Sequence, residues 1–112
     1  YLVWKQFPEL VDPDMILKGL NYLFGNHPYN NLSFVTGVGV GTKKVAYGNN
    51  RADYNVIPGG IVPGLLMRKP DFMENKDDYP FLWGENECCI NTVPNYVMLN
   101  LACIEVAAAI NK

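Results

Sequence analysis

The chain of 112 residues is poor in histidine and in runs of charge. His27 is its only histidine, which excludes a histidine-rich metal site and any mechanism that needs two imidazoles. Nine lysines and arginines stand against eleven acidic residues, and they are spread along the chain without a run of one sign. Because nucleic-acid-binding proteins normally carry a clustered basic surface, we expect no nucleic-acid partner. We also expect no metal and no cofactor.

Cysteines and long apolar runs are scarce as well. Cys88, Cys89 and Cys103 are too few for a disulfide framework, and the adjacent pair lacks the spacing of a zinc knuckle. We interpret all three as small buried side chains on a helix. No apolar stretch reaches the roughly 18 to 20 residues that span a bilayer, so we expect no membrane partner. The chain starts at Tyr1 without a basic leader, and we expect it to be trimmed from a longer protein.

Apolar residues make up 49% of the chain, which rules out disorder as its main state. A first helix is predicted to open at Asp12-Pro13, where an acid precedes a proline in the first turn. Gly25-Asn26 is a typical C-terminal stop. The apolar positions of this helix repeat at i, i+4, i+7 and i+8 and form one stripe: Ile16, Leu20, Leu23 and Phe24.

A second helix is predicted from near Asn86, through Pro94, to about Asn111. Between Val97 and Ile110 only an asparagine and a glutamate are strongly polar. A helix that is apolar on nearly every side is buried on nearly every side, so this helix requires covering elements.

The stretch 26–84 between the two helices has no helical period. Short β pieces are expected near Leu32–Val35, Lys44–Tyr47 and Tyr54–Ile57. A connection of this length is unusual, and its many aromatic and aliphatic residues indicate an ordered segment. We therefore predict a mainly α chain, one segment over 1–112, with two main helices joined by a long ordered region. Such a chain lacks a self-sufficient core and is expected to belong to a larger helical protein.

The glycine-rich run 37–43 superficially resembles a phosphate-binding loop. Its spacing does not fit GxxxxGK[ST], and no helix follows it, so a glycine-rich turn in a surface loop is the better interpretation. His27 lies at the end of the first predicted helix, where we expect it to cap carbonyl groups.

Acidic residues alternate with aromatic residues before the second helix. A solvated acidic loop is one interpretation of this pattern. The setting of Glu87 favours another, because Trp83 precedes it and Cys88 and Cys89 follow it at the predicted helix start. Apolar surroundings raise the pKa of a carboxylic acid, and a protonated carboxylic acid near neutral pH is what a general acid in glycoside hydrolysis requires.

Four segments, in order, resemble glycoside hydrolase family 9. The stretch 21–28 and the strip Ser33-Phe34-Val35-Thr36-Gly37-Val38-Gly39 are similar to that family's helix end and S-[YF]-V-T-G-x-G strip. Pro58-Gly59-Gly60-Ile61-Val62-Pro63-Gly64 looks like its PGALVGG loop. Asp78, Trp83, Asn86 and Glu87 have the spacing of its last signature, and together the segments cover about residues 12 to 110.

The resemblance implies the C-terminal part of an (α/α)6 barrel that cleaves β-1,4-glucans or related β-glycosides with inversion. Glu87 would be the general acid, supported by Asp78 and Asn86. The water-activating carboxylates of the family lie in its N-terminal part, so these 112 residues alone are expected to be inactive. A secreted or periplasmic location follows by the same resemblance.

The resemblance also suggests residues for the sugar. The family's His-His-Arg strip has Asn49-Asn50-Arg51 as its best counterpart here, so only Arg51 carries over as a substrate-binding residue. Trp83 and Tyr47 are further candidates, since sugar faces stack on aromatic rings. Two other functions stay open. One is a non-catalytic carbohydrate-binding unit, with Trp83, Tyr47 and Tyr54 as its platform, and the other is a helical scaffold or a lyase-type barrel.

Overall fold

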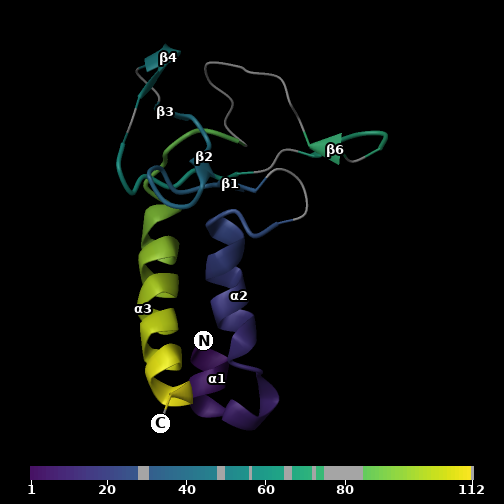
Figure 1. Ribbon diagram of the computed structural model, residues 1–112, viewed down its shortest axis with the longest axis vertical. Coiled ribbons are helices and arrows are strands. Elements are labelled where there is room, and N and C mark those ends of the chain that lie inside the picture. The colour runs from purple at the N-terminus through teal and green to yellow at the C-terminus, as the bar shows by residue number, and fades with distance from the viewer. Residues whose placement is uncertain are drawn as a thin grey trace.

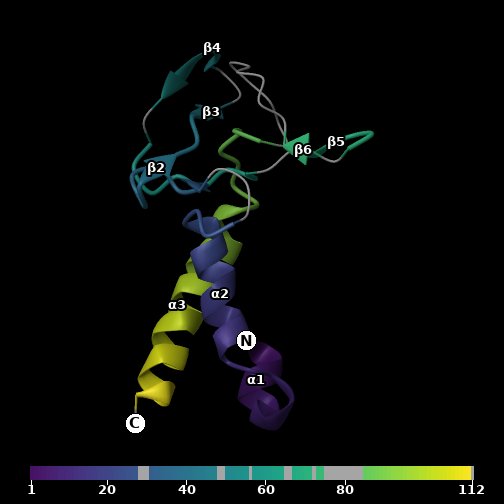
Figure 2. The same ribbon diagram turned by 45° about the vertical axis from the view of Figure 1, so that its right-hand side comes forward.

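Two long helices lie side by side and dominate the chain (Figure 1). A computed structural model describes residues 1–27, 31–47, 50–55, 57–64, 67–71, 73–74 and 85–111. Helices α2 (Asp14–Leu23) and α3 (Val93–Ile110) run in opposite directions, and both chain ends lie at the same end of the pair. The described residues between them, which we call the cap, lie over the other end, as Figure 2 also shows. The prediction of a mainly helical chain is confirmed.

Helix α2 begins and ends close to where its sequence predicts. The Asp12 carboxylate accepts a hydrogen bond from the Asp14 N–H at 3.0 Å, as expected of a residue that precedes a helix. At the other end Gly25 has φ +103°, a conformation that glycine adopts without steric cost. The predicted stripe faces α3, where Ile16 packs against Cys103 and Val106 in the first core cluster.

Helix α3 begins later than predicted. It starts at Val93, so the expected start near Asn86 is wrong. Pro94 explains the difference, because a proline fits the first turn, where its missing N–H needs no partner. The residues before it form turns, with both the N–H and the hydroxyl of Thr92 bonded to the Cys89 carbonyl. Glu87 and the Cys88-Cys89 pair therefore precede the helix, and only Cys103 lies on it.

One face of α3 is left uncovered by the described residues. Only Ala102, Cys103 and Val106 of this helix are buried. Opposite them, an apolar stripe repeats at i, i+4, i+8 and i+11, and Leu101 and Ile104 on it are 63% and 67% exposed. We call this the outer stripe, and it consists of Val93, Val97, Leu101 and Ile104.

The length of α3 also corrects the expectation about apolar runs. With 18 residues, it is long and apolar enough to cross a membrane by length and composition, and it is the one such helix among the described residues. Core helices of soluble proteins pass the same test when they are mostly buried, but 17% of this one is buried here. The absence of a membrane partner therefore stays a prediction.

The described residues of the cap form three short two-stranded sheets. The pieces expected at Leu32–Val35 and Lys44–Tyr47 correspond to the first and third strands, with shifted ends. The piece expected at Tyr54–Ile57 overlaps the fourth strand only at residues 54 and 55, because that strand begins earlier, at Asn50. The second strand was not predicted because its Gly41 has low strand propensity. The pairs are β1 (Leu32–Ser33) with β2 (Gly41–Thr42), parallel, β3 (Val45–Tyr47) with β4 (Asn50–Asn55), antiparallel, and β5 (Met67–Arg68) with β6 (Met73–Glu74), antiparallel.

The first residues of the chain close the end of the helix pair away from the cap. They form a short helix, α1 (Leu2–Gln6), followed by a 3-10 turn, η1 (Pro8–Leu10). Lys5 Nζ lies 2.8 Å from a Glu105 carboxylate oxygen, and the Tyr1 hydroxyl donates to the same carboxylate. These contacts join α1 to α3, and Trp4 packs beneath them on the first core cluster.

We predict that Glu105→Gln reduces the acid sensitivity of the fold. Hydrogen bonds from Lys5, and next from Tyr1, lower the pKa of Glu105 below its usual 4.5. A lowered folded-state pKa contributes stability above the usual value, and this contribution is lost as the pH falls through the folded-state value. Thermal unfolding followed by circular dichroism at about pH 7 and about pH 3 should show a smaller fall in Tm for the variant. Lys5→Met removes the main cause of the lowered pKa of Glu105, so it should also show a smaller fall in Tm. Equal falls in Tm in the unmodified protein and both variants would contradict the prediction.

Candidate functional site

The described residues of the four segments that resemble motifs of a glycoside hydrolase are connected at the end of α2 and in the cap. The first connection joins the end of α2 to the strip that starts at Ser33. The Phe34 N–H donates to the Leu23 carbonyl at 2.8 Å, and the Ser33 hydroxyl donates to the same oxygen at 3.3 Å. His27 is buried, with Nε2 2.9 Å from the Leu32 carbonyl. It therefore contacts a carbonyl of β1, whereas the sequence predicted a carbonyl of the helix end.

The second connection pairs the strip at 33–39 with the loop at 58–64. Val35 and Ile61 form an antiparallel bridge. The Val62 N–H donates to the Phe34 carbonyl at 2.9 Å, and the Thr36 N–H donates to the Gly60 carbonyl at 2.9 Å. Two motifs separated by about twenty residues in the sequence are thus paired side by side in space.

The third connection passes through Gly64. This residue has φ +110°, and a Cβ placed on it would lie 2.3 Å from the Phe34 ring. Only a glycine lets the loop approach that ring so closely. The Gly64 N–H donates to the Glu85 carbonyl at 3.2 Å, which ties the loop to the segment that leads to Glu87.

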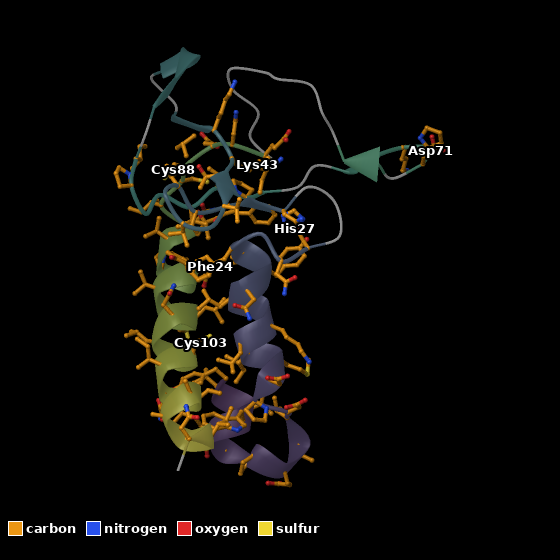
Figure 3. All side chains as sticks on the ribbon, viewed as in Figure 1. Phe24, His27, Lys43, Asp71, Cys88 and Cys103 are labelled. Carbon is orange, nitrogen blue, oxygen red and sulfur yellow. The ribbon has the colours of Figure 1, made fainter. Side chains whose placement is uncertain are left out.

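A buried ion pair completes the arrangement. Lys43 Nζ lies 2.6 Å from a Glu85 carboxylate oxygen, and the two side chains are only 8% and 11% exposed. The Lys43 N–H donates to the Ser33 carbonyl at 2.8 Å, so the lysine is also fixed to the strip. Figure 3 shows Lys43 in the cap, above the end of α2. Charges with so little solvent around them are rare unless they are paired.

The buried Lys43–Glu85 pair, which we call the anchor, lies two residues before Glu87. Glu87 is less buried than the two residues that precede it. Glu85 and Asn86 are buried, whereas Glu87 is half-buried. Its backbone carbonyl accepts a hydrogen bond from the Cys89 thiol at 3.6 Å. The burial of the chain therefore decreases from Glu85 and Asn86 to Glu87.

The two adjacent cysteines are thiols with a packing role. Cys88 packs against Phe34, Val45 and Val62, the second core cluster (Figure 3). Burial raises the pKa of the Cys88 thiol and the neighbouring Cys89 raises it further, although a hydrogen bond from the Ile61 backbone acts against this. A raised pKa keeps a thiol protonated and unreactive. The interpretation as small packing residues is therefore supported for Cys88, but its expected place on a helix is wrong.

An apolar groove of about 230 Å³ lies between the cap, the end of α2 and the first turns of α3. Glu87 does not line it, and its polar side chains come from α3 and from the turn before it. Its lining residues are Leu23, Ile61, Val62, Pro63, Thr92, Asn95, Tyr96 and Leu99.

The remaining predicted site residues are placed less completely. Tyr47 lies in β3 and Arg51 in β4, which are paired, with Tyr47 opposite Asn50. Asp78 and Trp83 lie outside the described residues, and so does the side chain of Tyr54. Asn86, which the sequence predicts as a supporting residue, lies directly before Glu87 and is buried.

Sequence reasoning missed the Lys43–Glu85 pair. Lys43 enters the sequence argument as the end of a glycine-rich pattern, and Glu85 as one of several acidic residues. The glycine-rich turn itself is confirmed, since Gly37 and Gly39 have φ +81° and +87°. Lys43 directly follows β2, and nothing in its local sequence specifies a partner 42 residues away.

The described residues contain no group of three or more histidines, cysteines or acidic residues that could hold a metal ion. Models of protein families, curated proteins and solved structures give no match to this chain. The chemistry of the site therefore has to be argued from its own residues. These offer a half-buried carboxylate, an amide directly before it and a buried ion pair behind it.

We predict that Lys43→Met destabilises the fold by about 3 to 5 kcal/mol, because it removes one partner of a buried ion pair. Lys18→Met is the matched control, since Lys18 pairs with Asp14 on the surface and such pairs contribute about 1 kcal/mol or less. The free energy of unfolding, measured with urea, tests both. The double variant K43M/E85M should recover most of the loss, since two apolar side chains can replace a buried pair. A loss in K43M no larger than in K18M would contradict the prediction.

Proposed function

We propose that this chain is the C-terminal part of the catalytic domain of an inverting glycoside hydrolase. Its substrate is a β-1,4-glucan or a related β-glycoside, and Glu87 is the general acid. The proposal rests above all on the convergence of four separate segments, each similar to a motif of glycoside hydrolase family 9, around the chain that carries Glu87. A secreted or periplasmic location belongs to the same proposal.

The chemistry assigned to Glu87 follows from its position. A general acid must reach the glycosidic oxygen with a proton, so its carboxyl group needs access to a cleft and a fixed backbone. Glu87 is half-buried and so remains partly open to solvent, where a substrate could reach it. The buried Glu85 and Asn86, with the ion pair of Glu85, supply the fixed backbone. Inverting enzymes place a second carboxylate roughly 6.5 to 9.5 Å away to activate the attacking water. We assign that base to a part of the protein outside these 112 residues.

The outer stripe of α3 supports the same architecture. An exposed row of large aliphatic side chains, including Leu101 and Ile104, marks a surface that another element covers. In an (α/α)6 barrel every helix packs against neighbouring helices, so the further helices of the catalytic domain are the occupants we assign to this stripe.

We predict that Glu87→Gln, in the protein that carries this chain, lowers kcat on β-1,4-glucan by about 10²- to 10⁴-fold, the usual contribution of a general acid. Glutamine keeps the size of the side chain but cannot donate a proton in the same way. Glu9→Gln, at the opposite end of the molecule in η1, is the matched control and should keep full activity. Undiminished hydrolysis by E87Q would refute the role of Glu87.

The 112 residues by themselves should not hydrolyse any glucan, because the base is missing. Turnover by this chain alone would therefore contradict the assignment of the catalytic base to another part of the protein. Saturable binding of cello-oligosaccharides to the chain alone, without turnover by the whole protein, would instead favour the carbohydrate-binding alternative.

We predict that Leu101→Lys destabilises the whole protein by more than about 2 kcal/mol, since it places a charge where other helices pack. Leu10→Lys is the matched control, because Leu10 is 70% exposed in η1, and the exposed fraction of Leu101 in the chain alone is similar. Thermal unfolding of the two variants tests the difference. Equal Tm values would contradict packing of α3 in a barrel, and recovery of the protein in the membrane fraction would point to a bilayer as the occupant of the stripe.

A further inference from the structure

We propose that Lys43 and Glu85 are positioning residues for the carboxyl group of Glu87. This inference rests on the proposed function of Glu87 as a general acid, and it adds two residues that act through it. Neither residue needs to touch the substrate, because the Lys43 ammonium group and the Glu85 carboxylate are engaged with each other at 2.6 Å.

The geometry holds Glu85 at two points. Its side chain is bound by Lys43, and its backbone carbonyl accepts a hydrogen bond from the Gly64 N–H. Two residues further along, Glu87 is within about 7 Å of this anchor even in a fully extended chain. A shift in the position of Glu85 therefore also shifts the backbone of Glu87, because only one residue lies between them.

The anchor is itself connected to the helix pair. The Lys43 N–H donates to the Ser33 carbonyl, and the neighbouring Phe34 N–H donates to the Leu23 carbonyl at the end of α2. These bonds, with the ion pair, form a continuous connection from α2 to the residues before Glu87. A site held by rigid elements keeps its geometry more precisely than one on an unsupported loop.

Stability alone is a poor explanation for this pair. A buried ion pair is expensive to desolvate, and apolar side chains of similar volume often stabilise a fold equally well or better. What an apolar pair does not supply is direction, because an ammonium and a carboxylate meet within a narrow range of distances. The pair therefore fits a requirement for fixed geometry at a neighbouring residue.

Glu85→Asp and Lys43→Arg test the proposal, because each keeps both charges and changes the geometry in which they meet: aspartate shortens the reach of the carboxylate, and arginine replaces the ammonium with a larger planar group. We expect kcat of the protein that carries this chain to fall about 10- to 100-fold on a β-1,4-oligosaccharide, as small misplacements of a reacting group do, with KM nearly unchanged. On a dinitrophenyl β-glycoside, whose leaving group departs without protonation, kcat should stay close to that of the unmodified protein. Lys18→Arg, in the exposed ion pair on α2, should leave kcat unchanged on both substrates.

Equal losses on both substrates would overturn the proposal, because a purely structural role lowers all activities alike. If the unmodified protein hydrolyses no β-glycoside, the proposed function fails, and amide hydrogen exchange then decides the positioning role separately. E85D should speed exchange at Asn86 and Glu87 and leave the amides of α2 and α3 as they are. Unchanged exchange at these two residues would overturn the positioning role even in an inactive protein, and so would unchanged kcat in an active one.

Discussion

The buried Lys43–Glu85 pair is the constraint on which the cap depends. Two charges lie 2.6 Å apart with almost no solvent around them, so removing either one takes away an interaction that offsets the cost of burying the other. The pair joins the end of the glycine-rich turn to the segment that enters α3, two parts of the chain that are 42 residues apart. Around it the hydrogen bonds of Ser33, Phe34 and Gly64 connect the helix end, the strip and the loop. The cap is thus held by a few directional contacts and by a small apolar cluster of Phe34, Val45 and Val62.

The helix pair is held differently, by shape and apolar surface. Ile16 of α2 packs against Cys103 and Val106, which lie on one side of α3. The other side of α3 carries the outer stripe, so a single helix serves as core on one face and as a surface for further packing on the other. This division explains how the chain can be nearly half apolar and yet bury few large side chains, and it is the physical basis for placing the chain within a larger helical domain.

The parts that could be predicted from the sequence are those with local causes. Asp12, the apolar repeat and Gly25 specify α2, because a cap, a stripe and a residue with positive φ act within a few residues of themselves. The start of α3 was misjudged because the apolar run was extended backwards past Pro94, although proline at a first turn is also a local signal. For the candidate site the sequence predicts Glu87 as a general acid with Asn86 and Asp78 in support. It does not predict the ion pair, since a lysine and a glutamate in distant segments carry no mark of their pairing.

The sequence by itself determined that the chain is mainly helical, where α2 begins and ends, that the glycine-rich run is a turn, and that Glu87 lies among apolar and aromatic neighbours in the sequence. Only the tertiary structure decided that Lys43 and Glu85 form a buried pair, that Gly64 must accommodate the Phe34 ring, and which side of α3 faces α2. The physical reason is the range of the forces involved. Backbone propensity and capping act between neighbours in the chain, whereas desolvation, ion pairing and packing depend on which distant segments the fold brings together.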